Sequence, residues 1–167
     1  MTQSAVKAIP DGIHTITAHI VVRDAGRAAE WYKKALGAEE RGRIPVPGGK
    51  FMQIALWFGD SAVMIADEFP EAGVLSPQAI GGNPVVLHFS TENVEALWNR
   101  VTEAGAEVVQ PLQDQFWGDR YGQIRDPFGY RWGLASTFEM FLMRRSHVLQ
   151  QQHLAVNEHL HNLSTRL

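Results

Sequence analysis

Apolar and polar side chains alternate over residues 16–23, a period of two that predicts a β-strand with one buried face. The apolar set is Ile16, Ala18, Ile20 and Val22. A helix is predicted next, because Asp24 is a suitable N-cap and Gly37 suits the left-handed backbone at a helix end. Its buried stripe is Ala28, Ala29, Trp31, Tyr32, Ala35 and Leu36. Three more strands are predicted near 38–44, 51–58 and 61–66.

The same series of elements is predicted a second time, because short stretches of sequence recur about 69 residues later. His19–Asp24 returns as His88–Asn93, and Asp60–Ala66 aligns with Gly129–Ala135. The second copy has a strand near 85–90, with Val85, Leu87 and Phe89 facing a helix that runs from Asn93 to Gly105. Further strands are predicted near 107–112, 120–125 and 130–136.

The repeat predicts an α+β fold in which residues 1–137 form one domain of two βαβββ modules. The modules span residues 12–67 and 84–136, and a linker of residues 68–83 joins them. A module of this size cannot close a core of its own, so we expect the two modules to pair. A functional site is expected in the cleft between them.

Residues 138–167 are predicted to form a C-terminal helical extension. Apolar residues recur there every seven positions, at Leu142, Leu149, Val156 and Leu163. Two interpretations remain open: a helix that packs across a dimer partner, or a helix that lies on its own domain and frays at its end.

The composition of the chain argues against several classes of function. The 167 residues are 45% hydrophobic and 20% charged, which is typical of a globular protein. The chain has no cysteine, which excludes disulfides and thiolate ligands. A net charge of -3 gives no basic surface for nucleic acid. No apolar run approaches the ~20 residues of a membrane span, and the start lacks the features of a secretion signal, so a cytoplasmic location is expected.

Two neighbouring motifs carry a resemblance to a known family. Gln115-Phe-Trp-Gly-Asp-Arg-Tyr-Gly122 and Asp126-Pro-Phe-Gly-Tyr-Arg-Trp132 resemble the vicinal oxygen chelate superfamily of glyoxalase I, fosfomycin and bleomycin resistance proteins and extradiol dioxygenases. With Val22-Arg-Asp24, Trp31-Tyr32 and Leu36-Gly37 added, the chain looks most like the PhnB-type branch. The resemblance implies that the curved mixed sheets of the two modules form a cup, commonly assembled as a homodimer. In metal-dependent members, histidine and glutamate in this cup bind one divalent ion.

The metal ligands implied by the resemblance are missing from this chain. The corresponding positions are Thr17, Met64, Val86 and Gly133. None offers the nitrogen or carboxylate oxygen that such an ion needs, and Thr17 is a poor substitute. We therefore predict no metal and no cofactor. His19 and His88 each lie two residues beyond a lost position, so a shifted metal pair is an alternative, and it would require Asp67 or Asp119 as a carboxylate.

Seven residues are predicted to bind a ligand in the cup: His19, Gln53, Trp57, His88, Trp117, Asp119 and Tyr121. Trp117 is suited to stack on a planar ligand, while Asp119 fixes its orientation. Alternatively, Phe116 and Trp117 cap the end of the barrel and Asp119 bridges to Arg120 or Arg125. Trp57 also fits a role in core packing. Arg125 and Arg131 are interpreted as charges at the sheet edge.

The leading hypothesis is a dimeric, metal-free cup that binds a small organic molecule, with no nucleic-acid or membrane partner and no assigned catalytic residue. One alternative is a metal-dependent lyase, isomerase or dioxygenase-like enzyme that uses the shifted His19 and His88. Another is a metal-free acid–base catalyst with His88 as the base. A third is an interaction protein whose functional surface is the C-terminal helix.

Overall fold

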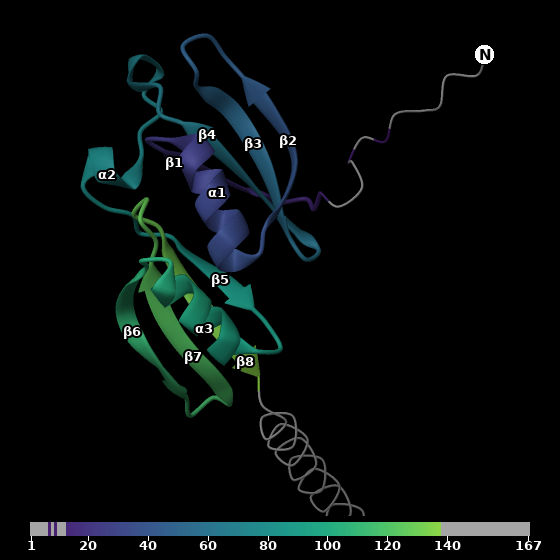
Figure 1. The fold of residues 1–167 in the computed structure, drawn as a ribbon, viewed down its shortest axis with the longest axis vertical. Coiled ribbons are helices and arrows are strands. Elements are labelled where there is room, and N and C mark those ends of the chain that lie inside the picture. The colour runs from purple at the N-terminus through teal and green to yellow at the C-terminus, as the bar shows by residue number, and fades with distance from the viewer. Residues whose placement is uncertain (1–6, 8, 10–12, 138–167) are drawn as a thin grey trace, which may run out of the picture.

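The computed structural model describes residues 7, 9 and 13–137, and the helix predicted for 138–167 lies outside the described residues. The described chain has an α+β fold of two βαβββ modules joined by a linker, which confirms the predicted α+β class and its two modules (Figure 1). The first module comprises β1 (Ala18–Val22), α1 (Ala25–Leu36), β2 (Glu39–Pro45), β3 (Phe51–Phe58) and β4 (Ser61–Asp67). The second comprises β5 (Val86–Ser90), α3 (Val94–Glu103), β6 (Glu107–Asp114), β7 (Asp119–Arg125) and β8 (Arg131–Thr137).

Each module contributes a mixed sheet of four strands, and the two sheets have the same topology. Their strand orders are β1-β4-β3-β2 and β5-β8-β7-β6, and the first strand of each module runs parallel to the last. His19 pairs with Met64 in the first sheet, as His88 pairs with Gly133 in the second. The sequence repeat is therefore a repeat of strand register as well as of strand order.

Capping residues fix the helix starts as the sequence predicts. Asp24 accepts a hydrogen bond from the Arg27 amide at 2.8 Å, and Asn93 accepts one from the Ala96 amide at 2.9 Å. Gly37 ends α1 with a φ of 74°, a conformation that costs glycine little.

The first strand of each module begins later than predicted, β1 at Ala18 and β5 at Val86. Ile16 precedes β1 and is 89% exposed, and Val85 precedes β5 and is 53% exposed. Both residues were assigned to buried faces because the alternation of apolar residues continues through them. The strands begin one or more residues later, so neither side chain reaches the helix-covered face of its sheet.

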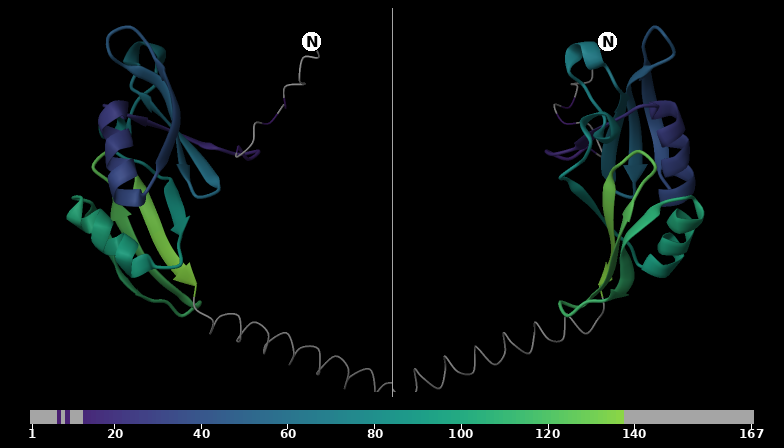
Figure 2. Two further views of the ribbon diagram at one scale, coloured as in Figure 1. Left: turned by 45° about the vertical axis from the view of Figure 1, so that its right-hand side comes forward. Right: turned by 90° about the vertical axis from the view of Figure 1, so that its left-hand side faces the viewer.

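The two long helices lie on the same side of the two sheets (Figure 2). The buried residues of α1 and α3 pack against alternate strand residues, among them Ile54, Leu56, Ile124 and Leu134. Within the described residues no helix covers the opposite faces, which we call the first and second open faces. The first carries His19, Gln53, Trp57 and Met64; the second carries His88, Tyr121, Gln123, Arg131 and Gly133.

The buried carboxylate of Asp126 joins the two modules. It accepts hydrogen bonds from the Phe128 and Tyr130 amides, both at 2.9 Å, which fix the turn between β7 and β8. It also accepts the Trp132 indole N–H at 2.9 Å and the Tyr32 hydroxyl, from α1 of the other module, at 2.6 Å. Burial raises the pKa of Asp126, although these hydrogen bonds favour the ionised form.

Further polar contacts and a shared core complete the junction. The Tyr130 hydroxyl donates to the Val21 carbonyl at 3.0 Å and accepts from the Val21 amide at 2.9 Å. The Trp31 indole donates to the Ala104 carbonyl at 2.8 Å. One hydrophobic core contains buried residues from both modules, as expected for units too small to close separate cores.

The linker has local structure of its own. A short 3-10 helix spans Pro70–Ala72, and α2 spans Pro77–Ile80 after Ser76, whose hydroxyl accepts from the Ala79 amide. Of the described helices, none has the length and apolar character needed to cross a membrane.

The Tyr32–Asp126 contact predicts a pH-dependent contribution to stability. Burial, together with the nearby Asp126 carboxylate, raises the pKa of Tyr32 well above its usual value. The stability from the neutral hydroxyl is therefore complete below about pH 10 and is lost as the pH rises toward the raised folded-state pKa. Tyr32→Phe should lower the free energy of unfolding at pH 7 by about 1–3 kcal/mol and reduce the further loss above pH 10.

Urea denaturation at pH 7 and at pH 10.5 measures both effects. Tyr121→Phe is the matched control, because it removes a hydroxyl from a partly exposed ring. Equal stability of wild type and Tyr32→Phe at pH 7 would show that the Tyr32–Asp126 contact does not hold the modules together.

Candidate functional site

The second open face carries a cluster of rings and amides. The His88 imidazole stacks on the Tyr121 ring, with centroids 5.9 Å apart and planes 11° from parallel. Trp117 meets Tyr121 edge to face at 6.0 Å. The Gln123 amide donates to the Tyr121 hydroxyl oxygen at 2.8 Å. We call these four residues, His88, Trp117, Tyr121 and Gln123, the aromatic platform.

The platform depends on the absence of a side chain at Gly133. A Cβ atom at this position would lie 2.7 Å from the Tyr121 hydroxyl oxygen and 2.8 Å from Tyr121 Cε2. Such distances are too short for carbon, so any larger residue would push the ring away. Gly133 therefore allows the Tyr121 ring to lie across β8, beside His88 on β5.

Asp119 orients Trp117 at the end of the platform. The Trp117 indole donates to Asp119 Oδ2 at 3.0 Å. Arg120 pairs instead with Glu95 at 2.6 Å and with Asp114 at 2.9 Å. Phe116, next to Trp117, is 90% exposed. This arrangement leaves the face of Trp117 at the surface, with its indole N–H already bonded.

Three of the residues predicted to bind a ligand lie on the other sheet. His19 is exposed on β1, beside Met64 of β4. Gln53 and Trp57 lie on β3, two steps of the pleat apart and on the same face. The Arg41 guanidinium lies 4.8 Å from the centre of the Trp57 ring. The structure thus joins His88, Trp117, Asp119 and Tyr121 through direct contacts on one sheet, whereas His19, Gln53 and Trp57 belong to the first open face.

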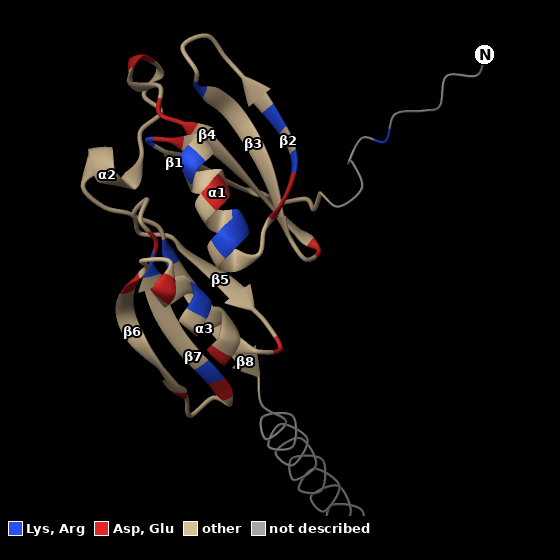
Figure 3. Cartoon of the chain, viewed as in Figure 1, with Lys and Arg blue, Asp and Glu red and all other residues tan. Residues whose placement is uncertain are grey.

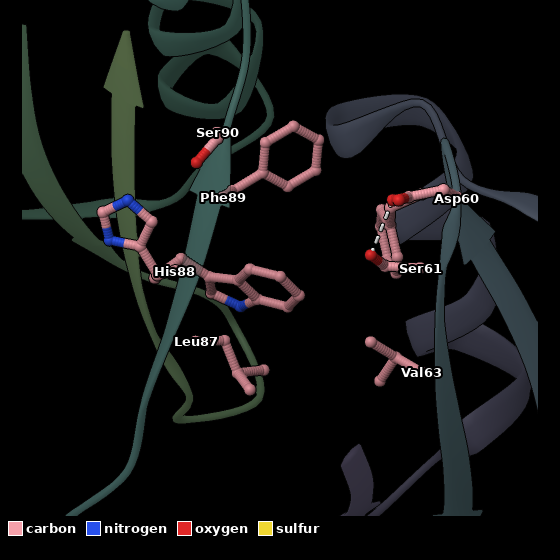
Figure 4. Close-up of a pocket in the computed structure, with 9 residues that line it drawn as sticks. Asp60, Ser61, Val63, Leu87, His88, Phe89 and Ser90 are labelled. Atoms are coloured by element: carbon pink, nitrogen blue, oxygen red, sulfur yellow. Dashed lines mark hydrogen bonds between the residues drawn. The ribbon is translucent and has the colours of Figure 1, made fainter. Parts of the chain in front are cut away.

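A pocket of about 380 Å³ separates β5 from the end of the β3–β4 hairpin. Leu87 and Phe89 of β5 face Val63 across this inter-module pocket (Figure 4). Asp60 and Ser61, joined by a 2.9 Å hydrogen bond, lie at the hairpin end. His88 and Ser90 project from the opposite side of β5 and also line this pocket, so His88 belongs both to the inter-module pocket and to the aromatic platform.

Fold and sequence together define the family. The chain belongs to the Glyoxalase/Bleomycin resistance protein/Dioxygenase superfamily, whose profile matches residues 12–134. It is 43% identical over 122 residues to the uncharacterized protein Mb0911c of Mycobacterium bovis, covering 71% of this chain and 80% of that protein. The uncharacterized protein Rv0887c of Mycobacterium tuberculosis is also 43% identical, with 71% and 72% covered.

Solved structures share the fold. TioX from Micromonospora sp. ML1 is 26% identical with a TM-score of 0.59, over 74% of this chain and 98% of TioX. A mutant of the fosfomycin resistance protein FosX from Listeria monocytogenes, complexed with Mn(II) and 1S,2S-dihydroxypropylphosphonic acid, is 13% identical with a TM-score of 0.56, over 73% and 90%. At that identity, the likeness to FosX concerns the fold alone.

The residues at the superfamily's metal positions do not fit a metal ion. Met64 has no suitable donor, and Gly133 has no space for a carboxylate beneath Tyr121. Asp67, a carboxylate that a shifted site would need, is buried and accepts the Ala25 and Phe51 amides at 2.9 and 2.7 Å. Asp119 is bonded to Trp117. Among residues 7, 9 and 13–137, no three His, Cys, Asp or Glu side chains are grouped to hold a metal.

The sequence analysis did not identify two residues that contact the predicted ligand-binding residues. Gln123 is two residues beyond Tyr121 on β7, so the period of a strand already places both on one face. Arg41 was not identified because an irregularity in the pairing of β2 with β3, between Glu40 and Gly42, interrupts the register beside it. A bulge of this kind has no reliable signal in a single sequence.

The contact between Gly133 and Tyr121 predicts strong energetic coupling. Gly133→Ala should lower the free energy of unfolding by about 1–3 kcal/mol, because the new methyl group collides with the Tyr121 ring. In a Tyr121→Ala background, Gly133→Ala should lower the free energy of unfolding by at least about 1 kcal/mol less than it does in wild type, because the ring is absent. Urea denaturation of the four proteins gives the coupling energy, and a coupling near zero would contradict the placement of Tyr121 over Gly133.

Proposed function

We propose that this chain binds a small organic molecule with a planar group on the second open face, against the aromatic platform. The observation that carries the proposal is the Tyr121 ring, which lies over Gly133, the position where the resemblance implies a metal-binding glutamate. Stacked rings offer a flat apolar surface to a planar ligand. His88 and Gln123 lie beside that surface as the polar groups that would orient the ligand.

The first open face is proposed as the opposite wall of a ligand-binding cup. His19, Gln53 and Trp57 would contribute from this wall, with Asp119 fixing Trp117 on the other. The equivalent registers of His19 and His88 support this pairing of faces.

Since no described helix covers either face, we further propose a homodimer in which a second copy helps to enclose the cup. Light scattering during size-exclusion chromatography tests this, and a strictly monomeric protein would contradict it.

Within the superfamily, we infer a place in the PhnB-type branch. The motifs Val22-Arg-Asp24, Trp31-Tyr32 and Asp126-Pro-Phe-Gly-Tyr-Arg-Trp132 support this inference. A PhnB protein from Bacillus cereus, described as a putative 3-demethylubiquinone-9 3-methyltransferase, shares the fold at 14% identity with a TM-score of 0.57, over 74% of this chain and 100% of that one.

Binding of the neutral planar probe 2-naphthol tests the platform. Titration followed by 1H–15N NMR should shift the indole N–H signal of Trp117 in a saturable manner. Tyr121→Ala should weaken binding about two- to twelvefold, because it removes one aromatic contact worth about 0.5–1.5 kcal/mol. Tyr121→Phe should bind nearly as well as wild type. Met52→Ala, at an exposed site on β3, is the control for general loss of apolar surface.

The same titration can contradict the proposal. Saturation of other signals while Trp117 stays unchanged would place the ligand elsewhere, and the inter-module pocket is the first alternative. Equal weakening by Met52→Ala and Tyr121→Ala would show that the probe adheres to apolar surface without a defined site.

Metal analysis distinguishes the proposed binding protein from a metalloenzyme with shifted histidines. The protein is incubated with Zn²⁺, Mn²⁺, Ni²⁺ or Fe²⁺ and desalted, and the bound metal is measured. We expect less than one ion per chain, because no three His, Cys, Asp or Glu side chains are grouped to hold a metal in the part of the chain that the structure describes. One ion per chain, lost in His19→Ala or His88→Ala, would reject the proposal and favour the enzyme.

A further inference from the structure

A second pocket, of about 460 Å³, lies between the linker and the turn that joins β7 to β8. We call it the linker pocket, and its polar side chains are Gln78, Asn83, Arg125 and Arg131. Its walls are fixed by direct contacts. The Gln78 amide donates to the Pro127 carbonyl at 2.9 Å. A Cβ at Gly129 would lie 2.9 Å from Pro77 Cβ, so linker and turn are in close contact.

Two arginines meet in this pocket with incomplete charge compensation. Arg125 and Arg131 are directly opposed on β7 and β8, at the end of the second sheet nearest α2, where basic residues are blue in Figure 3. Like charges in opposed positions of a sheet destabilise it. Arg125 pairs with Glu107 at 2.7 Å, but no ion pair of Arg131 is recorded within residues 13–137. No described residue that lines the pocket is acidic.

Asn83 adds a buried donor to the pocket. Its Oδ1 accepts the Val85 amide at 3.0 Å, which fixes the orientation of the side-chain amide. Its Nδ2 is buried and has no hydrogen-bond partner among the described residues. A buried donor without an acceptor is unfavourable, so an acceptor from outside the chain would stabilise the site.

Glycines leave the pocket accessible. A Cβ atom built at Gly81 or at Gly82 would meet no other atom within 4 Å. These two glycines therefore place no side chain that would fill the pocket. Besides Gln78, whose amide N–H₂ is bonded to the Pro127 carbonyl, the pocket offers the guanidinium groups of Arg125 and Arg131 and the unpaired amide N–H₂ of Asn83, which are donors.

We propose that the linker pocket binds a small oxyanion, the carboxylate or phosphate group of a metabolite, through Arg131, Arg125 and Asn83. Guanidinium groups form charge-assisted hydrogen bonds with both anions. The bound anion would offset the repulsion between the arginines and accept the unpaired Asn83 N–H. This site is separate from the aromatic platform, and its test does not depend on binding there.

Titration of the full chain with inorganic phosphate and with acetate tests the site, at constant ionic strength set with chloride. The side-chain amide signal of Asn83 in 1H–15N NMR spectra is the direct readout. Wild type should show saturable shifts of this signal at millimolar anion concentration. Tighter binding of phosphate indicates a phosphorylated ligand and tighter binding of acetate a carboxylic acid, and either result supports the site.

Four variants make the test specific. Arg131→Gln should weaken binding at least about tenfold through loss of a charged hydrogen-bond donor. Asn83→Asp keeps the acceptor for the Val85 amide but repels an anion, so it should abolish binding, with the Gly82 amide signal as its readout. Arg120→Gln removes the same charge from the other face of β7 and should bind like wild type. Tyr121→Ala should leave anion binding unchanged.

Two results would overturn the proposal. One is the absence of saturable shifts in wild type with both phosphate and acetate. The other is equal weakening by Arg120→Gln and Arg131→Gln, which would show a response to net charge alone.

Discussion

The buried Asp126 carboxylate is the constraint on which the rest of the structure depends. Four hydrogen-bond donors converge on it, two from the β7–β8 turn, one from Trp132 and one from Tyr32 on α1 of the other module. An ionised group in a protein interior is tolerated when hydrogen bonds replace its hydration. The same carboxylate therefore shapes the turn and connects the modules, so the position of β8 relative to α1 is fixed before any ligand is bound.

Both proposed sites depend on the strand that this constraint positions. β8 begins at Arg131, beside the linker pocket, and reaches Gly133 two residues later, beneath the Tyr121 ring. Because side chains alternate along a strand, Arg131 and Gly133 lie on the open face while Trp132 enters the core. At Gly133, where the resemblance implies a metal-binding glutamate, the Tyr121 ring lies over the open face.

Much of the fold was predictable from the sequence because the chain contains its βαβββ unit twice. The caps at Asp24 and Asn93 and the alternation on β5 are local signals, and the structure agrees with them. The sequence predicts which site residues share a face of a sheet, but it does not predict which side chains contact each other. The Tyr121–Gly133 overlap depends on a rotamer and on the spacing of neighbouring strands. The interpretation of Arg125 and Arg131 as sheet-edge charges did not anticipate the linker pocket, because the contact of the linker with the β7–β8 turn is a tertiary contact without a local signal.

The most direct test of the central claim is anomalous diffraction at the zinc edge from crystals grown with Zn²⁺. The account predicts the Tyr121 ring over Gly133 and no zinc beside His88. A zinc ion about 2.0–2.1 Å from an imidazole nitrogen of His88, with the Tyr121 ring displaced, would contradict it.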